Sequence, residues 1–277
     1  MELTSGRSEI VIGLIDGPVA THQPDLAREN IRELNGTQQG SCSQTKSVAC
    51  MHGTFVAGIL CAKRNSAAPA ICPDCTLLVR HIFIESMAQN GAMVSATPEE
   101  LATAIIECVA AGARVLNLSV ALAHPSSKGE GQLEEALSYA ARRGVLVVAA
   151  AGNQGMLGSS AITRHPWVIP VMAYDLKGQP MGQSNLGSSI GRRGLGAPGD
   201  GITSLGAEGE PLTSGGTSAA APFVTGAVAL LWSEFPNATA AQVKLAVTNS
   251  HALRRTTVVP PLLDAWAAYQ ILRQAHA

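Results

Sequence analysis

The chain has few charged residues, few aromatic residues and no long unbroken apolar segment. Only 14% of its 277 residues are charged, 4% are aromatic, and the net charge is −1. This near-neutral balance argues against nucleic-acid binding or membrane-surface binding through basic residues. No segment approaches the roughly 18 consecutive apolar residues of a membrane-spanning helix. With 46% hydrophobic residues, the composition is instead typical of a compact domain with a large core.

The first nine residues contain no apolar signal region. We therefore expect a cytoplasmic protein, with the mature form of a secreted domain as the alternative. The sequence is also compatible with one part of a larger multidomain protein.

Short apolar runs alternate with amphipathic segments along the chain. Strands are predicted at 10–15, 76–84, 113–120, 145–151 and 167–174, and helices at 52–62, 98–111, 130–143, 215–235, 239–249 and 262–274. This alternation predicts an α/β fold, a mostly parallel twisted sheet with helices on both faces. No repeat or linker divides the chain, so residues 1–277 are predicted to form a single domain. The Gly- and Ser-rich stretch 182–210 is expected to form surface loops with a short strand near Ile202.

Four polar residues stand at the junctions of these elements. Asp16 ends the first strand, and Asn153 follows the strand at 145–151. His52 is expected to open the first long helix, and Ser218 begins the helix at 215–235. Because functional residues of an open parallel sheet gather at the carboxyl ends of its strands, these four side chains are expected to converge.

Ser218 follows the glycine pair at 215–216, which lets the backbone turn sharply and approach a substrate closely. The helix start behind it offers unpaired N–H groups and a partial positive charge that favour an anion nearby. An ordinary helix N-cap is the alternative for Ser218. Turn or loop roles are the alternatives for Asp16, His52 and Asn153.

Together the four residues fit nucleophilic catalysis. A serine hydroxyl is a weak nucleophile until a histidine accepts its proton, and that histidine needs a carboxylate to fix its tautomer. The expected roles are Ser218 as nucleophile, His52 as general base and then acid, and Asp16 as the orienting carboxylate. The Asn153 amide and the Ser218 N–H would stabilise the tetrahedral oxyanion.

The motifs around these residues resemble the subtilisin-like serine proteases, in which Asp, His and Ser follow one another in this order. The resemblance extends over roughly residues 8–250. It implies that Leu118, Ser119, Val120 and Ala121 form a strand that pairs with the substrate backbone, and that Ala151 and Gly152 belong to the primary specificity pocket. The matching segments are Ile12-Gly13-Leu14-Ile15-Asp16-Gly17-Pro18, His52-Gly53-Thr54-Phe55-Val56-Ala57-Gly58, Ala150-Ala151-Gly152-Asn153 and Gly216-Thr217-Ser218-Ala219-Ala220-Ala221-Pro222.

Within that family the segments 18–20, 165–171 and 215–223 are similar to those of proteases that mature cyanobactin-type ribosomal peptides, which implies a peptide or precursor-peptide substrate. Macrocyclising members carry a helical insertion between the aspartate and the histidine, whereas only 35 residues separate Asp16 from His52 here. Without a lid, water should outcompete a peptide amine for the acyl-enzyme. Hydrolysis is therefore favoured, and a macrocyclase or an inactive peptide-binding module are the alternatives.

The six cysteines lie within the first 108 residues, away from Ser218. A disulfide between Cys42 and Cys50 would stiffen the approach to His52. Cys72 and Cys75 could form a second bridge, a redox pair or two thiols in a turn, and a zinc site from all four is a further alternative. No cofactor is expected. The resemblance suggests calcium, but the loop at 63–70 has no acidic residue.

Overall fold

The computed structural model describes residues 3–34, 42–83, 85, 96–120, 130–249 and 257–276. Its centre is a seven-stranded sheet in the order β2-β3-β1-β4-β5-β6-β7, in which every neighbouring pair is parallel. The strands are β1 Val11–Asp16, β2 Ile31–Glu33, β3 Thr76–His81, β4 Val115–Leu118, β5 Leu146–Ala150, β6 Val168–Tyr174 and β7 Leu195–Pro198. The predicted α/β fold is confirmed.

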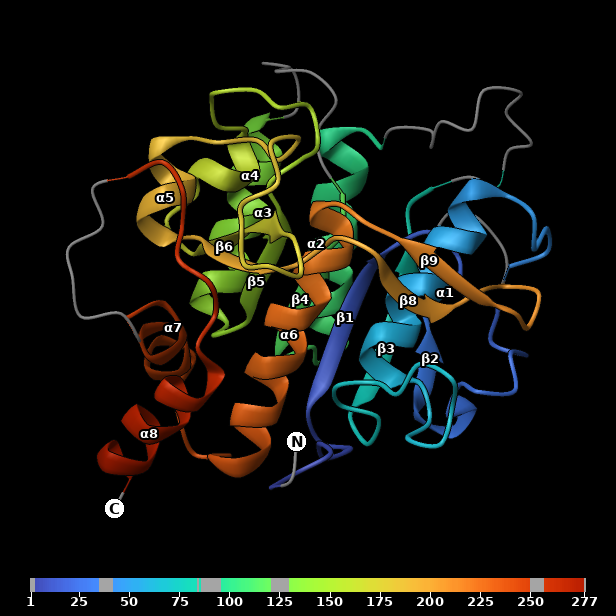
Figure 1. Cartoon of the computed structure of the whole chain (residues 1–277). Helices are drawn as coiled ribbons and strands as arrows, with labels where there is room; N and C mark the ends of the chain where they lie inside the picture. The colour runs from blue at the N-terminus through green and yellow to red at the C-terminus, as the bar shows by residue number, and fades with distance from the viewer. Residues whose placement is uncertain are drawn as a thin grey trace.

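Helices cover both faces of the sheet, as Figure 1 shows. They are α1 Val48–Cys61, α2 Pro98–Ala110, α3 Glu130–Arg142, α4 Ala161–Arg164, α5 Ser188–Arg193, α6 Thr217–Glu234, α7 Ala240–Thr248 and α8 Ala265–Ala275, with a 3-10 turn at Arg28–Asn30. An antiparallel hairpin, β8 Ile202–Leu205 and β9 Pro211–Ser214, lies outside the sheet. No helix within the described ranges is long and apolar enough to cross a membrane.

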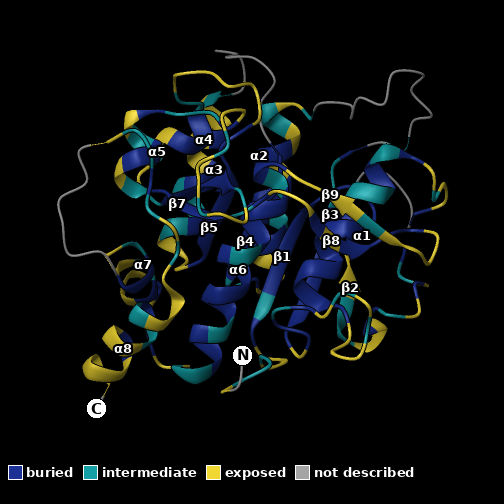
Figure 2. Ribbon diagram, viewed as in Figure 1, coloured by how far each residue is buried: buried dark blue, intermediate teal, exposed yellow. Residues whose placement is uncertain are grey.

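The sheet separates two cores. Ile12 and Leu14 of β1 join the core that contains residues of α1 and α6, whereas Ile15 joins the core that contains residues of α2 and α3. Because the central strands are buried on both faces, their sequences are continuous apolar runs rather than alternating patterns. Figure 2 shows this burial along the central strands and along α6.

The local structure differs from the sequence predictions in several places. Helix α1 begins four residues before His52, because the Ser47 side chain accepts the Cys50 N–H and caps the helix earlier. Strand β2 was not predicted, since three residues at the sheet edge give no clear pattern. The stretch predicted as surface loops contains helix α5 and strand β7 as well as the expected strand near Ile202.

Candidate active site

The turn after β1 brings Asp16 and His52 together. A Cβ added to Gly17 would lie 2.0 Å from the Ala49 carbonyl oxygen, and one added to Gly53 would lie 2.4 Å from the Gly17 carbonyl oxygen. Two glycines therefore let helix α1 lie directly against the turn. As a result, the His52 Nδ1 atom is 2.6 Å from Asp16 Oδ1.

Asp16 is fully buried, and its Oδ1 also accepts the Gly17 N–H at 2.6 Å. The other oxygen, Oδ2, accepts no hydrogen bond from the described residues. Burial acts on the pKa of His52 most strongly and lowers it, but the charge and the hydrogen bond of Asp16 together outweigh burial. The pKa of His52 is therefore raised above its ordinary value of 6.5.

Ser218 lies in the first turn of α6, behind a glycine that the backbone requires. Gly216 has φ +101°, which favours glycine, and its N–H donates to the Gly199 carbonyl at 2.6 Å. The Ser218 side chain is half-buried. The predicted position of this residue at a glycine-hinged helix start is therefore confirmed.

Pro222 explains how the backbone of Ser218 is held. In a regular helix the N–H four residues later would donate to the Ser218 carbonyl, but proline has no N–H. The Ser119 hydroxyl donates to this carbonyl instead, at 3.0 Å. Ser119 in turn accepts from Asn117 Nδ2 at 2.8 Å, and the Thr225 hydroxyl donates to Asn117 Oδ1 at 2.8 Å. A buried polar chain thus ties the end of β4 to α6.

Asn153 follows β5 and lies beside the start of α6. Its Oδ1 accepts the Thr217 N–H at 2.9 Å, and the Gly152 N–H donates to the Thr217 hydroxyl at 3.1 Å. Because Asn153 Oδ1 accepts the Thr217 N–H, the amide nitrogen Nδ2 is the atom of this side chain that could donate to an anion. A Cβ on Gly216 would lie 2.9 Å from this Nδ2.

The Asp16–His52 pair and the Ser218–Asn153 pair lie at the same edge of the sheet. Asp16 ends β1, Ser119 follows the neighbouring strand β4, and helix α6 packs against both α1 and β4. No hydrogen bond joins the Ser218 hydroxyl to His52 among the described residues. Catalytic hydrogen bonds are often long before substrate binds, so the lack of this bond does not exclude proton transfer between the two side chains.

The residues predicted to contact substrate lie at the ends of β4 and β5. Leu118 is the last residue of β4 and is buried, where it is aligned with Ile15 of β1 and Ala149 of β5. Ser119 and Val120 follow the strand end and are also buried, whereas Ala121 lies outside the described residues. The pairing of this segment with a substrate backbone stays a prediction.

Ala151 and Gly152 lie just beyond β5, next to Asn153. Gly152 has φ +102°, and a Cβ there would lie 2.3 Å from Asn185 Nδ2. The prediction from sequence missed Asn185 and Thr217, the two side chains that fasten this loop. Thr217 lay inside a recognised motif, but nothing in the sequence distinguished Asn185 from other residues of a polar loop.

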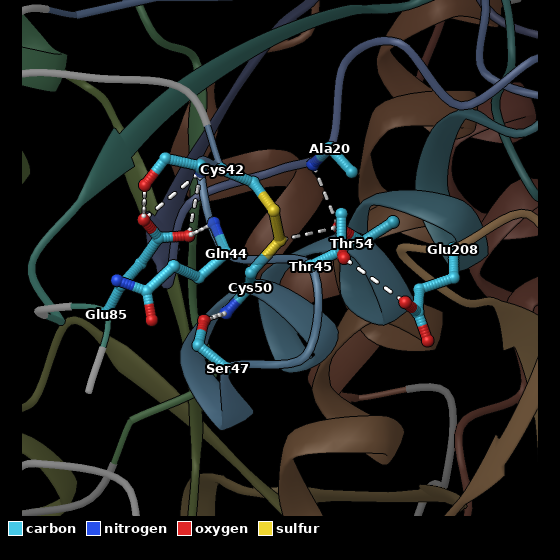
Figure 3. The surroundings of a disulfide bond; sticks show 10 residues. Ala20, Cys42, Gln44, Thr45, Ser47, Cys50, Thr54, Glu85 and Glu208 are labelled. Atoms are coloured by element: carbon cyan, nitrogen blue, oxygen red, sulfur yellow. Dashed lines mark hydrogen bonds between the residues drawn. A yellow bond between two sulfur atoms is a disulfide. The ribbon is translucent and has the colours of Figure 1, made fainter. Parts of the chain in front are cut away.

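The disulfide between Cys42 and Cys50, which the sequence left open, is present. It joins the segment before α1 to the first turn of that helix, two residues before His52 (Figure 3). Glu85 holds the same segment, because its carboxylate accepts the N–H groups of Ser43 and Gln44.

The second bridge and the four-cysteine zinc site are contradicted. Cys72 and Cys75 are buried free thiols in the main core, whereas Cys42 and Cys50 are joined to each other in a separate small cluster. Cys61 and Cys108 are also buried free thiols.

A model of the subtilase family matches residues 7–264. A relative among characterised proteins, the thermophilic serine proteinase of Bacillus sp. (strain AK1), is 32% identical over 239 residues, which are 85% of this chain. The chain spans 55% of that relative's length. The family match includes the whole seven-stranded sheet and Asp16, His52, Asn153 and Ser218.

Solved structures give the same result at the level of the fold. A variant of the PatA protease domain has a TM-score of 0.89 and 29% identity, with 99% of each chain covered. The prenylagaramide maturation protease PagA has a TM-score of 0.83 and 25% identity, with 98% of this chain and 96% of PagA covered. The PatG macrocyclase, at 19% identity and a TM-score of 0.81 over 98% of this chain and 93% of its own, shows only that the fold is shared.

Proposed function

Because the chain belongs to the subtilase family, we propose that it is a serine endopeptidase that hydrolyses peptide bonds through an acyl-enzyme. The observation that carries the proposal is the pairing of the fully buried Asp16 with the half-buried His52, with 2.6 Å between Oδ1 and Nδ1, together with the half-buried Ser218 at a helix start. In this mechanism His52 takes the proton of Ser218, and Asp16 stabilises the imidazolium that forms.

The developing oxyanion would be bound by Asn153 Nδ2 and the Ser218 N–H. Both donors are fixed before the reaction, Asn153 by its hydrogen bond to Thr217 and the Ser218 N–H by the start of α6. Such preorganised donors cost little reorganisation when charge develops. After acylation, His52 returns its proton to the leaving amine, and water then attacks the acyl carbonyl.

For the substrate we propose a ribosomal precursor peptide. PatA and PagA are named as maturation proteases, and both share the fold of this chain at 25% identity or more. Incubation with a peptide library, with cleavage sites identified by mass spectrometry, would define the residues on either side of the cut. Cleavage of proteins only, with no preference for particular peptides of the library, would contradict the proposal of a precursor-peptide substrate.

Hydrolysis rather than transfer to an amine is supported by the segment between Asp16 and His52. The described residues of that segment before α1 hold a 3-10 turn and the three-residue strand β2. Neither of these described elements is a helical cap over the site, which favours access of water to the acyl group. Mass spectrometry separates the two reactions, since a cyclic product lacks the added water.

Replacing Ser218 by alanine tests the activity itself. The rate constant kcat should fall by about 10⁶-fold, the loss known for the subtilisin nucleophile. The exposed Ser214, four residues earlier, provides a matched control, and Ser214→Ala should keep full activity. A fluorophosphonate probe should label the wild type and not Ser218→Ala. Unchanged cleavage by Ser218→Ala would refute the proposal, and absence of labelling in the wild type would favour an inactive binding module.

We propose that catalysis needs no cofactor, since the proton transfers require only Asp16, His52 and Ser218. Dialysis against a chelator should leave cleavage unchanged. For the compartment, the Cys42–Cys50 bridge favours the secreted alternative, because disulfides persist in oxidising compartments. Thiol labelling after unfolding would detect four thiols in a secreted protein and six in a cytoplasmic one.

A further inference from the structure

Asn185 makes five hydrogen bonds to one short segment, the loop at 151–156 after β5. Its backbone N–H donates to the Gly152 carbonyl at 2.9 Å. Its Nδ2 donates to the Ala151 carbonyl at 3.2 Å and to Gln154 Oε1 at 2.6 Å. Its Oδ1 accepts the N–H groups of Gln154 at 3.1 Å and Met156 at 3.0 Å.

These contacts bracket Asn153 in the sequence. Asn185 binds the residues immediately before and after Asn153, and its hydrogen bonds go to those neighbours rather than to the Asn153 side chain. The side chain therefore fills the inside of the turn on which Asn153 stands. Gly152 is required for this arrangement, because a Cβ at that position would lie 2.3 Å from Asn185 Nδ2 and the backbone has φ +102°.

The loop is thus fastened from two sides. Thr217 holds it to the start of α6 through Asn153 Oδ1 and the Gly152 N–H. Asn185 holds it to the segment between β6 and α5. Two further backbone bonds, from Gly155 N–H to Gln183 and from Leu186 N–H to Met156, join the same two segments.

We infer that Asn185 is a positioning residue for the oxyanion donor, acting through the backbone on either side of Asn153. The inference rests on the proposed function, since it assumes that Asn153 Nδ2 binds the oxyanion. Both polar atoms of the Asn185 side chain are engaged by the loop, so the side chain supports the loop rather than contacting the substrate. A displacement of a catalytic donor by about 1 Å costs up to about 100-fold in rate.

The test is a double-mutant cycle of Asn153→Ala and Asn185→Ala. Asn153→Ala should lower kcat by about 100-fold or more, as for loss of one oxyanion donor. Asn185→Ala should lower kcat by about 10- to 100-fold with KM nearly unchanged. In the Asn153→Ala background, adding Asn185→Ala should change kcat by no more than about 2-fold, because the residue acts through Asn153.

A purely structural role would give a different pattern. Asn30 also crosslinks two segments, since its Nδ2 donates to the Pro73 carbonyl at 3.0 Å, and it lies just before the edge strand β2. Asn30→Ala should lower the melting temperature without lowering kcat. If Asn185→Ala does not fold, Asn185→Asp keeps the two acceptor contacts, loses the two donor contacts and enters the same cycle.

The outcomes separate the two proposals. Equal losses from Asn185→Ala in both backgrounds would overturn the positioning role and leave the oxyanion role of Asn153 standing. A change in KM or in the preferred residue before the cut, with kcat unchanged, would make Asn185 a wall of the specificity pocket and also overturn the inference. If Asn153→Ala itself keeps full kcat, the oxyanion role fails, and the inference fails with it.

Discussion

The two halves of the candidate site are held in different ways. Asp16 and His52 are held by a charged hydrogen bond, by glycine contacts between α1 and the turn after β1, and by a disulfide two residues away. Ser218 and Asn153 are held by neutral hydrogen bonds, and no cysteine follows residue 108.

This difference follows from what each half does in the proposed reaction. His52 changes its charge during each turnover, so a buried carboxylate beside it directly stabilises the charged form. Ser218 and Asn153 are neutral before the substrate arrives, so neither needs a charged partner. Both need a fixed position. Neutral side-chain networks supply position without adding a competing charge near the oxyanion.

The largest expected effect comes from removing the negative charge of Asp16 beside His52. Asp16→Asn should lower kcat by about 10⁴-fold, because a neutral amide favours the wrong tautomer of His52 and cannot stabilise the imidazolium. Steady-state kinetics on a peptide substrate would measure it. The exposed Asp200 offers the control, since Asp200→Asn removes a carboxylate without touching His52. Similar kcat values for Asp16→Asn and the wild type would show that the pair is only structural.

The same pair predicts opposite pH effects on activity and on stability. His52 must be neutral to accept a proton, so kcat/KM should rise with pH through a midpoint above 6.5, since Asp16 raises the pKa. A group whose pKa is raised on folding stabilises the folded state below its unfolded pKa. That stabilisation is lost as pH rises through the folded pKa.

Between these two pKa values, activity should therefore increase while the contribution of His52 to stability decreases. Rate profiles and melting temperatures across this pH range would measure both. In Asp16→Asn burial acts on the pKa of His52 without the opposing carboxylate and lowers it, so the contribution of His52 to stability should instead increase as pH rises. A wild-type midpoint at or below 6.5 would contradict the role given to Asp16 in setting the pKa of His52.

The disulfide gives the next largest effect, and it acts on stability. Replacing both Cys42 and Cys50 by alanine should lower the free energy of unfolding by about 2–3 kcal/mol, because the bridge closes a short loop. Denaturant unfolding would measure the loss, and wild-type protein under reducing conditions should lose a similar amount. Glu85 still holds the segment at Ser43 and Gln44, so kcat should change much less than in Asp16→Asn.

The sequence predicted the chemistry of the site better than its supports. Asp16, Asn153 and Ser218 could be placed because each follows an apolar strand or a glycine pair, and these patterns are local. Asn185 could not be placed, because its partners, which are mostly backbone groups, belong to a loop 29–34 residues earlier. The support of Ser218 by Ser119 has the same origin: Pro222 removes a local donor, and the replacement comes from 99 residues away.

For the fold as well, elements with a clear local pattern were predicted, and elements that depend on tertiary contacts were missed. Buried strands such as β1 and β6 were predicted, because a continuous apolar run of strand length between turn signals is typical of a central parallel strand. Strand β7 was missed because its Leu195–Pro198 sequence contains glycine and proline, and its pairing with β6 depends on the tertiary structure. The start of α1 was misplaced because the capping residue, Ser47, stands in a polar stretch that resembles a loop.

The smallest expected effect tests the neutral network of the second half. Thr225 is fully buried and donates to Asn117 Oδ1 at 2.8 Å. Thr225→Val keeps the shape of the side chain but leaves that oxygen without its donor, which should cost about 1–2 kcal/mol of unfolding free energy. Thr103, an exposed helix threonine, gives the control, and Thr103→Val should have little effect on stability.

The kcat of Thr225→Val then tests whether the neutral network contributes to the reaction or only to stability. Asn117 keeps its bond to Ser119 in Thr225→Val, and Ser119 keeps its bond to the Ser218 carbonyl. Activity at moderate temperature should therefore remain close to that of the wild type, although the melting temperature falls. A loss of kcat as large as that of Asp16→Asn would mean that the neutral network contributes to the chemistry as directly as the charged pair does.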